Sequence, residues 1–444
     1  MSVPDGRGAG LEEMIAEADR TLASADRALA RDYPGPRPGR QPVHTVYVAA
    51  DRFAPGLAAR WGRQALTTLE TCAPSPEEFG AAMGLAPGLA ADVRSRVLAK
   101  LSAEPIEDLR LDFEDGYGDR GDDAEDADAR AAAACLAREA AAGSDLSGTE
   151  RGGVGGSSPR AGTVPFCGLR CKSLEPRTRR RAIRTVAEFL AGLLARGPLP
   201  AGFTVTLPKV TSPDQVAAMA RLCSRLEQAH GLAAGRLVFE VQVETPQVIL
   251  GADGTAVIAR CVHAAEGRLS GLHYGTYDYS AALGIAAHLR STEHPVADHA
   301  RAVMQVAAAG TGVRLSDGSS NVLPEGGRDE VTQGWRLHAR LVRRSLERGF
   351  YQGWDLHPAQ LASRYAATFG FFREGLPAAA ARLRGYVEQD RPGGTSQPGR
   401  VLEEPATARA LAGFLGRGLD CGAVSEAELA ELTGLGRPGL DALR

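Results

Sequence analysis

Apolar and polar positions alternate along short runs of this chain, and most of these runs precede a segment with helical periodicity. In the clearest case Phe239, Val241 and Val243 alternate with Glu240, Gln242 and Glu244. A period of two is typical of β-strands, and a period near 3.6 of amphipathic helices. Eight strand-like runs follow from this pattern: VHTVYVAAD (43–51), DLRLDFED (108–115), VPFCGLR (164–170), FTVTLPKV (203–210), LVFEVQVE (237–244), LSGLHYG (269–275), GVRLSD (312–317) and FYQGWDLH (350–357).

Repeated alternation of strand and helix predicts a parallel sheet covered by helices. Eight such units in one stretch favour a closed barrel over an open doubly wound sheet. The first strand is not followed by the G-x-G-x-x-G turn of dinucleotide-binding folds, which weighs against that alternative. The sequence therefore predicts an α/β fold, a (β/α)8 TIM barrel with an N-terminal helix and a helical C-terminal extension.

The segments between these runs suggest three parts. Residues 1–40 are expected to form an N-terminal helix and a linker, because helical periodicity over 11–32 ends at PGPRPGRQP. Residues 41–390 would form the barrel, with a glycine-rich insertion at about 143–163 that is too poor in apolar residues to pack. Residues 391–444 begin with RPGGTSQPGR and continue as short helices, a candidate lid or oligomer contact.

Composition excludes several classes of partner. Hydrophobic residues make up 44% of the chain and charged residues 24%, and the net charge of -3 gives no reason to expect nucleic acid or an anionic membrane as partner. No apolar run is long enough to cross a bilayer. The N-terminus lacks the order of a signal peptide, and the seven scattered cysteines are odd in number. We therefore expect reduced thiols and a cytoplasmic location.

Charged side chains occupy two levels of the predicted barrel. Arg110, Asp112 and Glu240 alternate with apolar residues and should point inward, where a satisfied ion network is the simplest interpretation. A second set lies where the strands end, which is the face that carries the active sites of this fold. These rim candidates are Glu114, Asp115, Arg170, Lys209, Glu244, Asp278 and His357.

The rim candidates suit chemistry on a small acid. Glu244 and Asp278 form a minimal site for a hard cation, since magnesium takes one or two protein carboxylates and leaves positions for water and substrate oxygens. Arg170 offers a planar fork for a carboxylate or enolate. The backbone at Gly275 and Thr276 is a candidate for binding the same anion.

Several segments resemble signature segments of the HpcH/HpaI aldolase and citrate lyase beta-subunit family, which includes malyl-CoA lyases. They occur in the same order, and the resemblance covers roughly residues 43–370. Its most specific part pairs VETP with HYGTYDYSAALG. The segments are DFED (112–115), Arg170, LPKV (207–210), VETP (243–246), HYGTYDYSAALG (273–284) and GWDLHPAQ (353–360).

The resemblance implies a barrel enzyme, usually oligomeric, that is a magnesium-dependent carbon–carbon lyase acting on a 2-oxo or hydroxy acid or its CoA thioester. Manganese is the alternative metal. Glu244 and Asp278 match the metal ligands, and Arg170 matches the arginine that holds the oxo acid or enolate. Glu114 and Asp115 match an acidic pair near the metal. A histidine of the closing strand is matched by His357, and relatives can supply a catalytic acid from a tail lid, for which Glu403, Glu404 and Asp420 are candidates.

Two other functions stay open at this point. Lys209 is one of three lysines among 51 basic residues, and a desolvated lysine at a barrel rim can form a Schiff base with a carbonyl substrate. A barrel that binds a small acid without catalysis, as a scaffold, is the second alternative. His273, His294 and His299 lack the spacing of a zinc site and are expected to be surface or rim residues.

Overall fold

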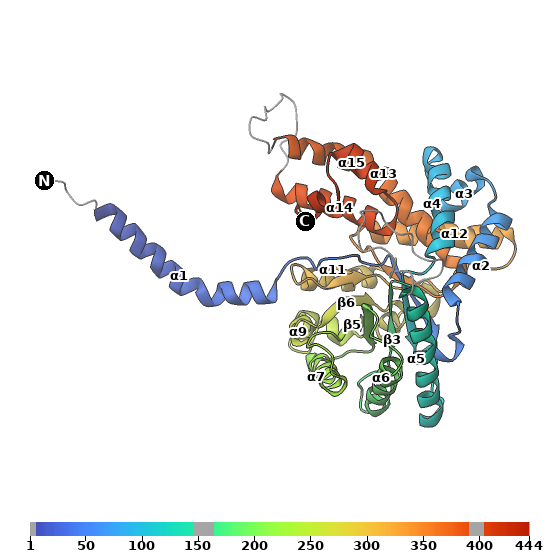
Figure 1. Cartoon of the computed structure of the whole chain (residues 1–444), viewed down its shortest axis with the longest axis horizontal. Helices are drawn as coiled ribbons and strands as arrows, with labels where there is room; N and C mark the ends of the chain where they lie inside the picture. The colour runs from blue at the N-terminus through green and yellow to red at the C-terminus, as the bar shows by residue number, and fades with distance from the viewer. Residues whose placement is uncertain (1–5, 145–163, 390–403, 444) are drawn as a thin grey trace.

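The computed structural model describes residues 6–144, 164–389 and 404–443. Most of the predicted glycine-rich insertion at about 143–163, and Glu403, lie outside the described residues. Figure 1 shows a barrel surrounded by helices, a helical C-terminal part beside it, and a long helix that runs away from the barrel at the N-terminal end.

Eight parallel strands form the barrel, as the alternating pattern predicts. Each strand pairs with its neighbours in chain order, from β1 to β7, and β8 pairs with β1. A parallel bridge between Ser316 and Gln352 brings β7 next to β8 and nearly closes the cylinder. The strands are β1 (His44–Ala49), β2 (Asp108–Asp112), β3 (Phe166–Arg170), β4 (Gly202–Leu207), β5 (Val238–Val243), β6 (Leu269–Tyr274), β7 (Arg314–Ser316) and β8 (Gly353–Asp355).

Helices connect successive strands and cover the barrel. Three α-helices lie between β1 and β2, because this connection is longer than the others. One helix in this connection begins with the capping box Ser75–Glu78, in which each residue binds the backbone N–H of the other. The covering helices are α2 (Leu57–Cys72), α3 (Pro76–Met83), α4 (Ala90–Ala103), α5 (Asp122–Ser144), α6 (Arg179–Leu194), α7 (Pro213–His230), α8 (Pro246–Ile249), α9 (Val257–Ala264), α10 (Thr276–Ala282), α11 (Pro295–Ala308), α12 (Arg328–Glu347) and α13 (Leu361–Gln389).

The apolar core lies between the strands and these helices. Phe113, just beyond β2, packs edge-on against Phe189 of α6, and Phe189 stacks on Phe203 of β4, each pair with ring centroids 6.2 Å apart. All three rings are buried. The outward parity expected for the apolar strand residues therefore supplies the layer that holds the helices against the barrel.

The inside of the barrel is charged. Arg110 donates to Asp108 through both terminal nitrogens and to Glu240 through Nε at 3.0 Å. The ion network expected inside the barrel is thus present between Arg110 and Glu240. Gly168 of β3 makes room for this arginine, since a Cβ there would lie 1.7 Å from Thr204 O and 2.9 Å from Arg110 Nη1. A buried charge network of this kind is tolerated only when every member is paired.

The C-terminal extension packs on the outside of the barrel domain. It comprises α14 (Pro405–Cys421), α15 (Glu426–Thr433) and α16 (Arg437–Asp441). Glu428 binds Arg96 of α4 and Arg373 of α13 at 2.9 and 2.8 Å, and Phe414 packs on Phe372. Asp420 forms an ion pair with Arg437. The described part of the extension is therefore fixed to α4 and α13, and its role as a lid stays a prediction.

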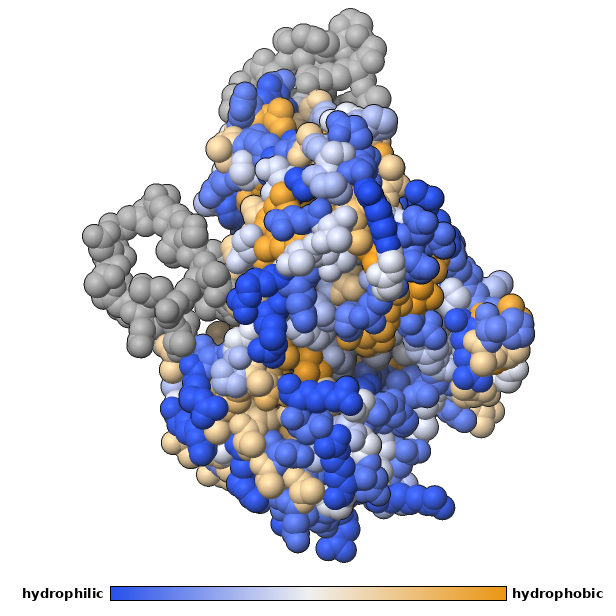
Figure 2. All heavy atoms as spheres, turned by 90° about the vertical axis from the view of Figure 1, so that its right-hand side faces the viewer, coloured by the Kyte–Doolittle hydropathy of each residue, from blue (hydrophilic) through white to orange (hydrophobic). Residues whose placement is uncertain are grey.

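One face of the molecule is mostly polar. On the face seen in Figure 2, hydrophilic side chains predominate, and apolar side chains appear in smaller areas between them. Among the described residues, no helix combines the length and apolarity that a membrane span requires.

Candidate active site

Lys209 lies at the centre of an acidic cluster at the rim of the barrel. Its Nζ is 2.6 Å from Glu114 Oε1, 2.9 Å from Asp278 Oδ2 and 3.1 Å from Asp115 Oδ2. These residues follow β2, β4 and β6, so three strand ends converge on one ammonium group. We call Glu114, Asp115, Lys209, Glu244 and Asp278 the rim cluster.

Glu244 completes the cluster from the end of β5. Its side chain is buried, and Oε1 accepts a hydrogen bond from the backbone N–H of Lys209 at 2.7 Å. Lys209 has a φ of 52°, in the left-handed region that is costly for a residue with a Cβ. This conformation lets one residue offer its N–H to Glu244 and its ammonium to the other three carboxylates.

Gly275 makes room for Glu244. A Cβ at this position would lie 2.5 Å from Glu244 Cβ and 2.7 Å from Oε2, so a side chain would displace the carboxylate. The Gly275 N–H donates to Val243 O at 2.9 Å and is not free to bind an anion. The buried Thr276 hydroxyl points toward Ser319 O, 3.4 Å away. Substrate binding by this stretch stays a prediction that now rests on Thr276.

Burial shapes the acid–base properties of the cluster. Burial raises the pKa of Glu244 to about 7, against the stabilising charge of Lys209. It also raises the pKa of Glu114, and the neighbouring Asp115 adds to this effect. Burial alone would lower the pKa of Lys209, but Glu244 and Glu114 raise it overall. The lysine is therefore a fixed cation, and the two buried glutamates hold protons more readily than free carboxylates do.

Arg170 is held rigidly beside the cluster. Its Nε and Nη2 donate to the two oxygens of Asp112 at 2.6 and 2.7 Å. Nη1 is 3.4 Å from both Gln242 Oε1 and Glu114 Oε2, and the guanidinium lies 4.9 Å from the centre of the Tyr47 ring. Two sides of the fork are thus occupied, while the long contacts of Nη1 leave it the nitrogen most able to bind a substrate.

His357 lies apart from this group. Its Nδ1 accepts from the Ala359 N–H at 3.3 Å, and its Nε2 is 3.4 Å from Glu325 Oε1. These contacts cap the turn after β8. The expected role of His357 in substrate binding stays a prediction.

His273 differs from the sequence-based expectation. It is buried inside the barrel rather than at the surface or rim. Its Nε2 is 2.7 Å from Glu240, and its Nδ1 accepts from Trp354 Nε1 at 2.9 Å. The parity of β6 contains the signal, because the core residue Leu272 faces outward and the next side chain must then face the interior.

Sequence reasoning missed a second buried network at the junction of β1 and β8. Asp355 accepts from His44 at 2.7 Å, from Arg364 and from His338 at 3.2 Å. Ser363 lies 2.8 Å from His338, so that a serine contacts a histidine, which in turn contacts an aspartate. All of these side chains are buried, so the arrangement connects the first and last strands of the barrel and is not accessible as a nucleophilic site.

The rim thus brings together six of the nine residues singled out from the sequence: Glu114, Asp115, Arg170, Lys209, Glu244 and Asp278. Gly275 supports Glu244 directly. Within the described residues, no group of three or more histidine, cysteine or carboxylate side chains is arranged to enclose a metal.

Comparisons with known proteins agree with this fold. The family model described as "Domain of unknown function (DUF6986)" matches residues 22–444, and no curated protein matches the sequence. The crystal structure of a citrate lyase from Burkholderia xenovorans LB400 covers 89% of this chain and 97% of its own, with 18% identity and a TM-score of 0.54. This likeness shows a shared fold, in keeping with the resemblance seen in the sequence motifs.

Two other structures are less similar. The Haloferax volcanii malate synthase in a magnesium/glyoxylate complex covers 92% of this chain and 99% of its own, with 13% identity and a TM-score of 0.47. The citrate lyase beta subunit from M. tuberculosis, complexed with oxaloacetate and magnesium, covers 74% and 96%, with 18% identity and a TM-score of 0.39.

Proposed function

The chain belongs to the family described as a domain of unknown function (DUF6986), and from the rim of this member we propose a magnesium-dependent carbon–carbon lyase or aldolase. Its substrate would be a 2-oxo or hydroxy acid, as the free acid or as its CoA thioester. One observation carries the proposal: four carboxylates from β2, β5 and β6 surround a single lysine beside a rigid arginine.

The residues present fit a magnesium ion. Glu244 and Asp278 offer only hard oxygen donors, the kind of ligand that magnesium prefers. Burial already raises the pKa of Glu244 to about 7, so an added positive charge would stabilise its ionised form. Asp278 is half-exposed and can be reached from the solvent. Magnesium held by this pair would supply positive charge for developing oxyanions and open positions for substrate oxygens.

Arg170 is the candidate for fixing the substrate's acid group. Its two bonds to Asp112 orient the guanidinium before any ligand arrives, which reduces the entropy that binding must lose. A carboxylate or enolate placed over Nη1 would receive a charge-assisted hydrogen bond.

Glu114 is the candidate for proton transfer. When the carbon–carbon bond breaks, its electrons pass to an enolate, and the hydroxyl proton of the cleaved substrate must go to a base. Glu114 Oε1 is positioned at the rim beside Lys209, and its raised pKa makes this carboxylate a stronger base than a free one. The enolate carbon then takes up a proton to complete the product.

The geometry disfavours the alternative Schiff-base mechanism. A lysine must lose its proton to attack a carbonyl, whereas Lys209 forms three ion pairs, and nearby carboxylates raise its pKa. The scaffold alternative predicts small-acid binding without turnover.

A substrate panel tests the proposal. Purified full-length protein is incubated with hydroxy-oxo acids and hydroxyacyl-CoA thioesters, and the released 2-oxo acid is measured. We expect cleavage that stops with a chelator, returns with magnesium, and is lost in Asp278→Asn but not in Glu70→Gln, an exposed control. Turnover that is indifferent to chelator, with a borohydride-trapped adduct on Lys209, would establish the Schiff-base route. Crystals soaked with magnesium and pyruvate, oxaloacetate or glyoxylate should show the ligand between Arg170 and the two acids.

A further inference from the structure

The N-terminal helix α1 (Gly6–Asp32) projects from the barrel with apolar side chains in the solvent. In Figure 1 it extends away from the rest of the molecule, and among the described residues no other helix or strand packs along it. Its large apolar side chains are 45% to 62% exposed: Leu11, Met14, Ile15, Leu22 and Leu29. Helices in proteins take most of their stability from packing an apolar face on a neighbour, so we expect another surface to cover an arm of this kind.

The apolar residues of α1 are spaced for another helix. Their positions are alternately four and three residues apart along the whole stripe, which is the repeat of a two-stranded coiled coil. The stripe is about 27 Å long at 1.5 Å per residue. Two of its positions are alanines, which permit close approach of a second backbone. The stripe consists of Leu11, Ile15, Ala18, Leu22, Ala25 and Leu29.

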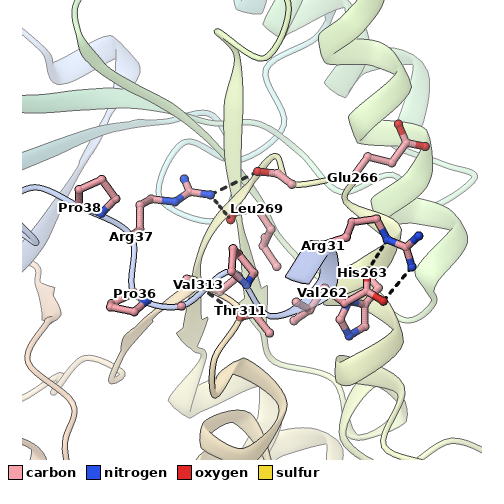
Figure 3. A pocket seen from close by; sticks show the side chains of 15 residues that line it. Arg31, Pro36, Arg37, Pro38, Val262, His263, Glu266, Leu269, Thr311 and Val313 are labelled. Atoms are coloured by element: carbon pink, nitrogen blue, oxygen red, sulfur yellow. Dashed lines mark hydrogen bonds and ion pairs between the residues drawn. The ribbon is translucent and has the colours of Figure 1, made fainter. Parts of the chain in front are cut away.

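The segment after α1 is bound to the base of the barrel, at the end opposite the rim cluster. Gly35 N donates to Gly310 O at 2.8 Å, and Arg37 donates to Gly267 O and Leu269 O at 3.3 and 3.1 Å. Figure 3 shows Arg37 reaching the start of β6 and Arg31 lying beside His263, around a cavity of about 650 Å³. The arm therefore leaves the barrel from a fixed point.

The charges on α1 indicate what covers the stripe. One flank is acidic, with Glu12, Asp19 and Asp26, and the other is uncharged, with Met14, Thr21 and Ala28. When two identical helices pack in parallel, each acidic flank faces the uncharged flank of the other helix. An antiparallel pair would instead bring the acids of both helices together. The helix is thus complementary to a second copy of itself in one orientation.

We propose that α1 is a self-association arm, which pairs in parallel with α1 of a second copy of this chain through the stripe from Leu11 to Leu29. The interface is isologous, as in most homo-oligomers. Because α1 leaves the barrel at its base, this pairing joins two barrels at their bases. The rim of each barrel stays open to substrate. The inference is independent of the proposed reaction.

Mass measurement tests the arm in the full-length protein. In Leu22→Glu/Leu29→Glu, two charges enter the stripe. The matched control Ala23→Glu/Ala30→Glu places the same charges one residue further along, off the stripe, and glutamate is a good helix former in both. Light scattering after size exclusion should give the stripe variant half the mass of the wild type and the control. Thermal unfolding of the barrel should be the same in all three, since the substituted residues lie outside the part of α1 that reaches the barrel, near Arg31.

Cysteine cross-linking tests the orientation. Ala25→Cys would place two thiols opposite each other in the parallel pair, and mild oxidation should give a disulfide-linked dimer. Ala23→Cys, on the outer face, should give none. The seven native cysteines are buried and contribute little background.

Equal masses for the stripe variant and its control would overturn the proposal, whether both are single chains or both are larger assemblies. A wild type with the mass of one chain would overturn it as well and would leave the stripe to a different protein. A twofold difference in mass without Ala25→Cys cross-linking would refute the parallel pairing.

Discussion

Glu244 is a buried carboxyl whose charge should destabilise the protein when no cation is bound. We therefore expect Glu244→Gln to make the protein more stable at alkaline pH in the presence of a chelator, although it removes a proposed metal ligand. The glutamine oxygen can still accept the hydrogen bond from the Lys209 N–H, so the substitution removes the charge and keeps the shape.

The size of the effect follows from the pKa. Burial raises the pKa of Glu244 from 4.5 to about 7, and each pKa unit corresponds to about 1.4 kcal/mol. Between pH 4.5 and 7 the folded protein binds more protons than the unfolded chain, so stability falls as the pH rises and the loss is complete above about pH 8. The penalty is roughly 3 kcal/mol at pH 8 and less than about 1 kcal/mol at pH 5.

Denaturant unfolding at both pH values, with chelator present, measures this difference. Glu244→Gln should unfold at a higher denaturant concentration than the parent at pH 8, and the gap should narrow at pH 5. Magnesium at pH 8 should stabilise the parent more than the variant, and Glu70→Gln should behave as the parent throughout. A variant that is less stable than the parent at pH 8, or a gap that does not change with pH, would refute the reasoning.

Three further outcomes are expected at the rim. Gly275→Ala should displace Glu244, because the added Cβ would lie 2.5 Å from Glu244 Cβ. The free energy of unfolding should fall by about 1–3 kcal/mol, and calorimetry should detect weakened magnesium binding. Arg170→Lys should raise KM for the acid substrate at least tenfold, because lysine cannot bind Asp112 through two nitrogens and still present a third donor; an unchanged KM would exclude Arg170 from substrate binding. Lys209→Met should lower the melting temperature of the chelator-treated protein, and magnesium should restore part of the loss; equal melting temperatures would show that the ion pairs of Lys209 contribute no stability.

Much of the fold was predictable from local patterns. The runs predicted as strands at 108–115 and 237–244 contain β2 and β5, since both runs alternate apolar with charged or polar residues. Of the run predicted at 312–317, only three residues form β7. Its neighbours in the barrel define it more than its own sequence does, because one face of so short a strand offers little periodicity.

Sequence position along a strand was enough to predict which residues lie at the rim. The contacts between their side chains were harder to predict. The rim residues follow from the rule that parallel strands end at the same face. The two bonds from Arg170 to Asp112 and the left-handed backbone of Lys209 do not follow from spacing. The network around Asp355 joins His44 to residues about 300 positions away, and no short sequence motif predicts such a contact.

The room that Gly168 leaves for Arg110 limits how this barrel can change over time. A side chain at Gly168 would collide with the neighbouring strand. Loss of Arg110 would leave Asp108 and Glu240 buried without a positively charged partner, and loss of either acid would leave the positive charge of Arg110 less well balanced. Each single replacement therefore lowers the stability of the protein, and an apolar barrel interior can be reached only by several replacements at once. Lineages that inherit this core are expected to keep it, even where the rim above diverges to another substrate.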